Sequence, residues 1–166
     1  MYNVPLVPST FNAPTAFEGK GFRLRPLSYD VMIADYAAVM KGALNLTTAD
    51  REDEYDYSQF TLQDEIIEVG WHTGEWRRRH SFAYSIMSPD NATCYGSVYI
   101  NPTKKRDYDA EAIMWVTPDV AAGLDDAVYQ GVKRWLAEVW PFAKVGYPGR
   151  EIAFKDWDLL ANQKQS

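Results

Sequence analysis

Residues 110–131 have the pattern of a strand that runs through a short turn into a helix, and the start of such a helix can hold a phosphate. The first amide groups of a helix have no partner within it and point outward. Here the turn contains one glycine, Gly123, followed by Asp125 and Asp126. These carboxylates stabilise the helix start by roughly 0.3–1 kcal/mol. They also repel a phosphate, by about 4 kcal/mol at about 4 Å before salt screening. The sequence therefore leaves two interpretations, a phosphate site and a helix capped by its own carboxylates.

Glu111 is the candidate general base. A carboxylate on a central strand can act as a base that removes a proton from a bound ligand or from a water beside it. Strand alternation places Glu111 on the same face as Ile113 and Trp115, where burial favours the higher pKa that a base requires. The alternative is a solvated, structural glutamate at the strand end, near Lys105 or Arg106.

An acidic segment, residues 50–56, contains five acids and one arginine and therefore carries a local charge of −4. It has no apolar face, which predicts a loop. Such a loop would favour a cationic acceptor, such as a polyamine, an aminoglycoside or a lysine side chain. A solvated surface segment is the simpler interpretation.

Aromatic and histidine side chains gather after the second predicted helix. His72, Trp76 and His80 share one face if the segment is helical, although Gly74 weakens that prediction. They either line a pocket or pack at the edge of the core. A metal site is not predicted, because the chain has only two histidines and no set of further ligands beside them. Cys94 is predicted to be a small core residue on a central strand.

The composition excludes several classes of protein. With 166 residues, of which 46% are hydrophobic and 14% aromatic, the chain can bury one core. A net charge of −6 argues against nucleic-acid binding, and the basic run at 77–79 is too short to reverse this. The single cysteine predicts a reducing, cytoplasmic setting. Prolines near the N-terminus interrupt any apolar run that could form a signal peptide or a membrane span.

Hydrophobic periodicity predicts the elements that must position these residues. Residues 1–20 lack periodicity and are expected to be an arm that lies on the domain or is disordered; residues 21–166 form one domain. Within it, the order is strand, helix, helix, three strands, helix, strand, which predicts an α+β domain with a mainly antiparallel sheet. The expected elements are a strand at 21–27, a helix ending at Gly42, a helix starting at the capping box Thr61–Asp64, strands at 82–86, 94–100 and 110–116, a helix from 124 to before Pro141, and a strand at 143–147.

This order resembles the GCN5-related N-acetyltransferase (GNAT) superfamily over about residues 21–147. The segments RLRPLSYD, CYGSVYINP and AEAIMWVTP carry the resemblance together with the element order. It implies a mixed sheet flanked by helices, in which a splayed strand pairs with the pantetheine arm of acetyl-CoA and the next helix start holds the pyrophosphate. It implies backbone contacts of Trp115 and Val116 to the pantetheine. The expected pyrophosphate-binding residues are Ala121, Ala122, Gly123 and Leu124.

The sequence departs from the family's phosphate motif, which reads Gln or Arg, two residues, Gly, one residue, and Gly or Ala. With Gly123 as the first glycine, Val120 takes the Gln or Arg position and Asp125 the final one. With Gly123 in the final position, Pro118 and Ala121 take the earlier ones. Neither register matches, and larger side chains would keep a pyrophosphate from the backbone.

The segment after the last predicted strand also differs from a typical family member, which continues through a helix and two strands. About twenty residues follow Tyr147, enough for one strand or one helical turn with Trp157 and Leu160 packed back. The family's helix often supplies a tyrosine that protonates the leaving thiolate. No residue of this chain is assigned to that role.

Three hypotheses follow. The first is an acyl-CoA-dependent N-acyltransferase, with acetyl-CoA as donor, Glu111 as base and an amine of a small molecule or protein as acceptor. The second is a non-catalytic relative whose splayed sheet binds a protein or another small ligand. The third is a subunit that pairs its C-terminal sheet edge with another chain, for instance in a homodimer. The missing glycines and the missing terminal strands favour the second and third hypotheses, and the intact strand order favours the first.

Overall fold

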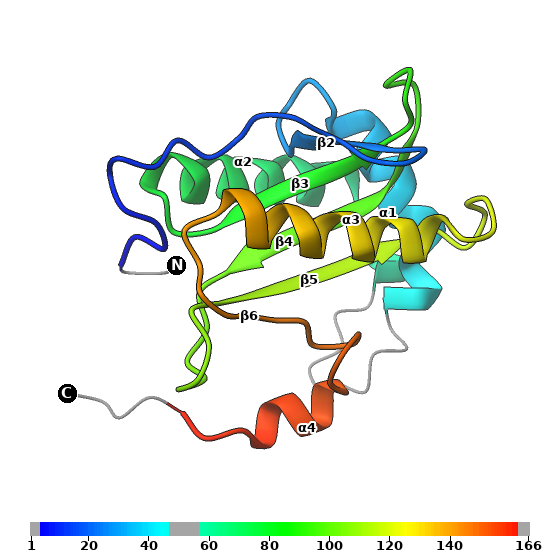
Figure 1. The fold of residues 1–166 in the computed structure, drawn as a ribbon. Helices are drawn as coiled ribbons and strands as arrows, with labels where there is room; N and C mark the ends of the chain where they lie inside the picture. The colour runs from blue at the N-terminus through cyan, green and yellow to red at the C-terminus, as the bar shows by residue number, and fades with distance from the viewer. Residues whose placement is uncertain (1–3, 47–56, 163–166) are drawn as a thin grey trace.

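A single mixed sheet organises the computed structural model, which describes residues 4–46 and 57–162 (Figure 1). Its strand order follows the chain, and all neighbouring strands are antiparallel except the parallel pair β5 and β6. The strands are β1 (Phe17–Glu18), β2 (Arg23–Pro26), β3 (Phe82–Met87), β4 (Cys94–Asn101), β5 (Ala110–Val116) and β6 (Val145–Gly146). The helices are α1 (Met32–Leu46), the short 3-10 helix η1 (Tyr57–Gln59), α2 (Leu62–Arg78), α3 (Leu124–Val139) and α4 (Phe154–Leu159). The α+β class predicted from the sequence is confirmed.

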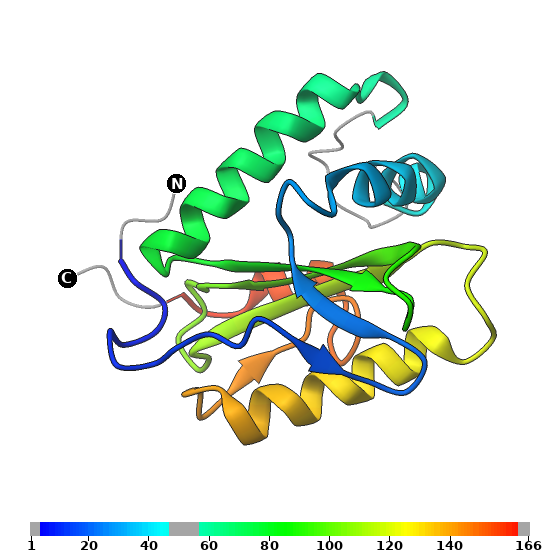
Figure 2. The same cartoon turned by 90° about the horizontal axis from the view of Figure 1, so that it is seen from above.

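Helices cover both faces of the sheet (Figure 2). On β3 every residue is buried, because alternate side chains face opposite layers. Phe82, Tyr84 and Ile86 lie in the core that α3 completes. Ala83 and Met87 lie in the smaller core beneath α1 and α2. The alternation that predicted the central hairpin therefore also separates two hydrophobic cores.

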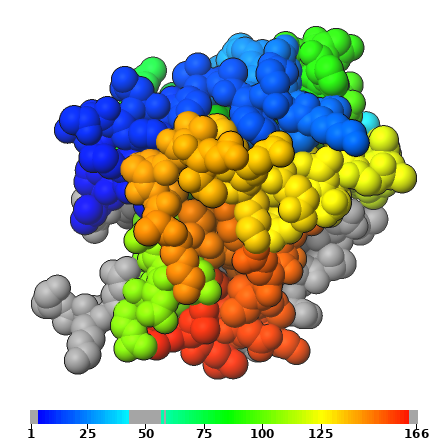
Figure 3. All heavy atoms as spheres, in the orientation of Figure 1, coloured from blue at the N-terminus to red at the C-terminus, as the bar shows by residue number. Residues whose placement is uncertain are grey.

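The segment before residue 21 packs along the domain beside α3 (Figure 3). Val7 is 2% exposed and belongs to the main core. The Tyr84 hydroxyl donates to the Pro14 carbonyl at 2.7 Å, and the Leu6 amide donates to the Arg79 carbonyl at 2.7 Å. Strand β1 also falls within this segment and forms one edge of the sheet. The predicted arm therefore lies on the domain and contributes both a strand and core side chains.

Helix α2 begins at the predicted capping box. The Asp64 amide donates to Thr61 Oγ1 at 3.2 Å, and the Thr61 amide donates to Asp64 Oδ2 at 2.8 Å. The helix continues through Gly74 and ends before Arg79, whose backbone is left-handed. His80 therefore lies outside the helix. Of the three side chains predicted to share one helical face, only His72 and Trp76 lie within α2.

Helix α1 passes through Gly42, so the prediction that this glycine ends the helix is wrong. A Cβ atom at Gly42 would lie 2.7 Å from the ring of Trp115. The glycine therefore allows close packing between α1 and β5 and does not serve as a C-cap. The acidic segment 50–56 lies outside the described residues.

A buried polar cluster joins α1 and α2 to the sheet. Asp35 and Glu65 are each 2% exposed. Asp35 Oδ1 accepts from the Ser85 hydroxyl at 2.9 Å, and from Cys94 Sγ and the Ser97 hydroxyl at 3.5 Å. Burial raises the pKa of Asp35, and burial together with the Asp35 charge raises the pKa of Glu65 to about 8. The two hydrogen-bonded carboxyl groups therefore share a proton near neutral pH. Burial also raises the pKa of Cys94, which confirms it as an unreactive core residue.

We expect the free energy of unfolding to fall as pH rises from about 4.5 to about 8. Over this range the unfolded chain ionises Glu65 while the folded protein still holds its proton, since 4.5 is the ordinary pKa and about 8 the folded one. Glu65→Gln should flatten this dependence. The measurement is urea unfolding at pH 5.5 and 8.5, with Glu138→Gln on the exposed side of α3 as control. An equal loss of stability in wild type and Glu65→Gln would contradict the assignment.

Candidate functional site

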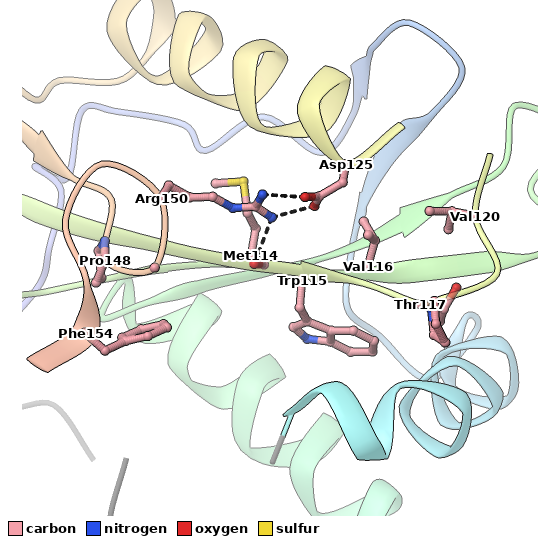
Figure 4. Close-up of a pocket in the computed structure, with 11 residues that line it drawn as sticks. Met114, Trp115, Val116, Thr117, Val120, Asp125, Pro148, Arg150 and Phe154 are labelled. Carbon is pink, nitrogen blue, oxygen red and sulfur yellow. Dashed lines mark hydrogen bonds and ion pairs between the residues drawn. The ribbon is translucent and has the colours of Figure 1, made fainter. Parts of the chain in front are cut away.

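A cleft opens between β5 and β6 where their pairing stops. The strands pair only at Ala110–Val145 and Glu111–Gly146. Beyond this point Pro148 has no amide hydrogen to donate, and the chain turns back on itself through the Gly149 amide, which donates to the Ile152 carbonyl at 2.8 Å. The resulting cleft has a volume of about 400 Å³ (Figure 4). Its lining comes from the end of β5, the turn that follows it, the start of α3, and the segment after β6: Met114, Trp115, Val116, Thr117, Pro118, Val120, Asp125, Pro148, Gly149, Arg150 and Phe154.

The backbone of β5 exposes a polar group to the cleft at Met114. Its carbonyl accepts from Arg150 Nη2 at 3.4 Å. The Trp115 carbonyl instead faces β4, because a Cβ atom at Gly96 would lie 2.0 Å from it. The Trp115 ring packs against Gly42 on the α1 side of the sheet. Trp115 and Val116 both line the cleft, and their contact with a pantetheine arm stays a prediction. The Met114 carbonyl was not foreseen, since hydrophobic alternation assigns side-chain faces and not the direction of backbone carbonyls.

An ion pair connects the two walls of the cleft. Arg150 Nη1 donates to Asp125 Oδ2 at 2.6 Å, and Nη2 donates to Oδ1 at 2.5 Å. The guanidinium also lies 5.8 Å from the ring centre of Tyr129, one turn further along α3. Asp125 therefore has a cationic partner that the sequence argument did not foresee. Asp126 is exposed and accepts a long hydrogen bond from Gln130 at 3.5 Å.

The start of α3 keeps donors that no side chain caps. Gly123 is the N-cap residue, with a left-handed φ of 82°, and makes no side-chain cap hydrogen bond. Ala121 and Ala122 are exposed beside it, and Leu124 is buried against the core. The turn is tied to α1 by the ion pair of Lys41 and Asp119 at 3.1 Å. An uncapped helix start beside a guanidinium is a donor set that fits a phosphate group.

Glu111 lies on the part of β5 that still pairs with β6, and it is not among the residues that line the cleft. Its Oε2 accepts from the indole nitrogen of Trp157 at 3.1 Å. Trp157 is 2% exposed, and a Cβ atom at Gly146 would lie 2.1 Å from its ring. Of the two expectations for this segment, one strand or one helical turn, α4 confirms the helical turn, with Trp157 buried and Leu160 only partly buried. The Lys105 ammonium, suggested as a neighbour of Glu111, donates to the carbonyls of Asp158 and Leu160 at 2.9 and 3.2 Å.

The aromatic and histidine cluster serves packing. The His72 ring stacks on Tyr99 with centroids 5.4 Å apart, and Trp76 packs edge-on against Phe82 and Tyr84. Burial lowers the pKa of His72 to about 4, so the ring is neutral near pH 7. None of these side chains lines the cleft.

Solved structures show the same fold. The S5-alanine ribosomal-protein acetyltransferase of Vibrio fischeri superposes with a TM-score of 0.60 at 9% identity over 75% of this chain and 68% of that one. RimJ of Mycobacterium smegmatis in complex with a CoA disulfide gives 0.60 at 14% identity, over 76% and 61%. RimL, a ribosomal L7/L12 alpha-N-protein acetyltransferase in complex with coenzyme A, gives 0.59 at 13% identity, over 74% and 67%.

These likenesses are of structure and not of sequence. No protein-family model matches the sequence, and the search of curated proteins finds no match. Within residues 4–46 and 57–162, no helix is both long enough and apolar enough to cross a membrane.

We expect two glycine substitutions beside the cleft to differ in cost. Gly123→Ala places a methyl group in open space and bears only the left-handed backbone strain, about 1 kcal/mol. Gly96→Ala drives a methyl group into the Trp115 carbonyl and should cost more than about 3 kcal/mol. Urea unfolding of the two variants measures this difference. Equal costs would show that the β4–β5 contact relaxes freely.

Proposed function

We propose that this chain, which has the fold of the GCN5-related N-acetyltransferases, is an acyl-CoA-dependent N-acyltransferase. The observation that carries the proposal is the cleft between β5 and β6, which opens onto the uncapped start of α3. RimL and RimJ, whose fold this chain shares, are described in complexes that contain CoA. Acetyl-CoA, when bound, supplies the thioester carbonyl that an amine attacks.

In this proposal the residues of the cleft divide into three roles. The free edge of β5 at Met114 and Val116 accommodates the pantetheine arm. The backbone at 121–124, at the uncapped start of α3, lies next to the phosphates, with the Leu124 amide itself already bonded to the Ala121 carbonyl at 3.0 Å. Glu111, held by the Trp157 indole on the paired part of β5 next to the cleft, accepts the proton that the attacking ammonium must lose. The Trp157 side chain is a positioning residue, since it fixes the carboxylate and has no reacting atom.

The acceptor in this proposal is an amine. RimL is named as an alpha-N-protein acetyltransferase, so the α-amino group of a protein is the first acceptor class to test. The net charge of −6 favours a cationic acceptor. A cytoplasmic location and pairing between two copies stay predictions from the sequence.

Calorimetric titration with CoA and with acetyl-CoA at low salt tests the cofactor. We expect a micromolar dissociation constant for both, because the cleft binds the shared pantetheine and phosphate groups. Absence of heat at millimolar ligand would contradict the proposal and favour a role as a protein-binding module.

Glu111→Gln should lower kcat for acetyl transfer at least about 100-fold while the dissociation constant of CoA changes little. The amide keeps the size of the side chain and its hydrogen bond to Trp157 but cannot take a proton. The pH profile of kcat/KM should lose its acidic limb in the variant. Glu138→Gln, at an exposed carboxylate of α3 that does not line the cleft, is the matched control. Full activity of Glu111→Gln would remove Glu111 from the mechanism.

A further inference from the structure

Arg150 is the only cation among the described residues that line the cleft. Its side chain is 20% exposed and is fixed from three sides, by the Asp125 carboxylate, the Met114 carbonyl and the ring of Tyr129. Its backbone belongs to a tight turn, because the Arg150 amide donates to the Tyr147 carbonyl at 3.1 Å. A guanidinium on a fixed backbone therefore points across the cleft at the first turn of α3 (Figure 4).

The Asp125 carboxylate binds the Arg150 guanidinium in the way that a phosphate would. A guanidinium presents parallel N–H groups that match two oxygens of a carboxylate or of a phosphate equally well. Asp125 makes this two-point contact with its two oxygens. Its side chain is 46% exposed, so water can solvate the carboxylate once the contact is broken. The pair is therefore exchangeable, with Arg150 as the less exposed partner and Asp125 as the more solvated one.

The position of Arg150 also explains how the turn before α3 can lack a phosphate-binding side chain of its own. Val120 or Pro118 stands where a phosphate-binding Gln or Arg is expected. Both side chains line the same cleft as Arg150, so a guanidinium from another segment reaches the space they border. Arg150 therefore supplies a cation at this place in the fold, although the turn before α3 contains none.

We propose that Arg150 is the phosphate-binding residue of the cleft, held on Asp125 until the diphosphate of CoA replaces the carboxylate. This inference rests on the proposed function. It adds that Asp125, at the start of α3, holds the Arg150 side chain in position when no ligand is bound. Asp125 does not exclude CoA from the cleft. No covalent bond changes: the guanidinium exchanges one anionic partner for another.

Calorimetric titration at low salt with two probes tests this role. CoA carries the diphosphate, and pantetheine carries none. Arg150→Gln should weaken CoA binding about 10- to 100-fold, as expected for a lost hydrogen-bonded charge, and leave pantetheine binding unchanged. Arg150→Lys keeps the charge but not the two parallel N–H groups of the guanidinium, so it should cause an intermediate loss of CoA affinity. Asp125→Asn, which removes the competing charge, should strengthen CoA binding several-fold.

Lys133→Gln is the matched control, because it removes the same charge from an exposed lysine that pairs with Glu151 and does not line the cleft. Thermal unfolding of each variant confirms that it is folded. CoA binding by Arg150→Gln equal to wild type would overturn the inference and leave the proposed function intact. An equal loss of CoA and pantetheine binding would also overturn it, since Arg150 would then only support the wall. No CoA binding by wild type or any variant would overturn both proposals.

Discussion

The cleft exists because hydrogen bonding between β5 and β6 stops after two residue pairs. Parallel strands that stayed paired would bury the edge of β5, and no ligand could approach it. Pro148 ends this pairing because it cannot donate, and the turn that follows carries the chain away from the sheet. The divergence leaves an unpaired strand edge beside a helix start, two sets of backbone groups that need partners. The Met114 carbonyl and Arg150 meet in the space that this interruption opens.

The acidic residues of this chain are stabilised in different ways according to their burial. Asp125 is half exposed and has a guanidinium partner. Asp35 and Glu65 are buried without a nearby cation among the described contacts, and one proton shared between them reduces their charge. Burying two full negative charges so close together would cost far more free energy than keeping that proton. A net charge of −6 is thus compatible with a well-packed interior, because the interior carboxyl groups are not both ionised near neutral pH.

Much of the fold could be predicted from the sequence because its signals are local. Alternation along β3 and β4, the capping box of α2 and the spacing of apolar residues along α3 each depend on neighbours a few positions away. The prediction that Gly42 ends a helix failed because this glycine instead makes room for the Trp115 ring, which lies more than seventy residues further along the chain. The partner of Asp125 was missed for the same reason, since Arg150 comes from another segment. Val7 carried no periodic signal, and only tertiary packing places it in the core. The assignment of Glu111 as base stays a prediction.

One wall of the cleft comes from a single short stretch, the turn and helix start from Pro148 to Phe154. This stretch is anchored from outside the cleft, by the buried Trp157 ring and by the Lys105 ammonium on the carbonyls that follow it. Substitutions within the wall therefore leave the two hydrophobic cores untouched. In evolutionary terms, this arrangement separates the part of the chain that selects a ligand from the part that must fold, so new binding preferences can arise in a few residues at little cost to stability.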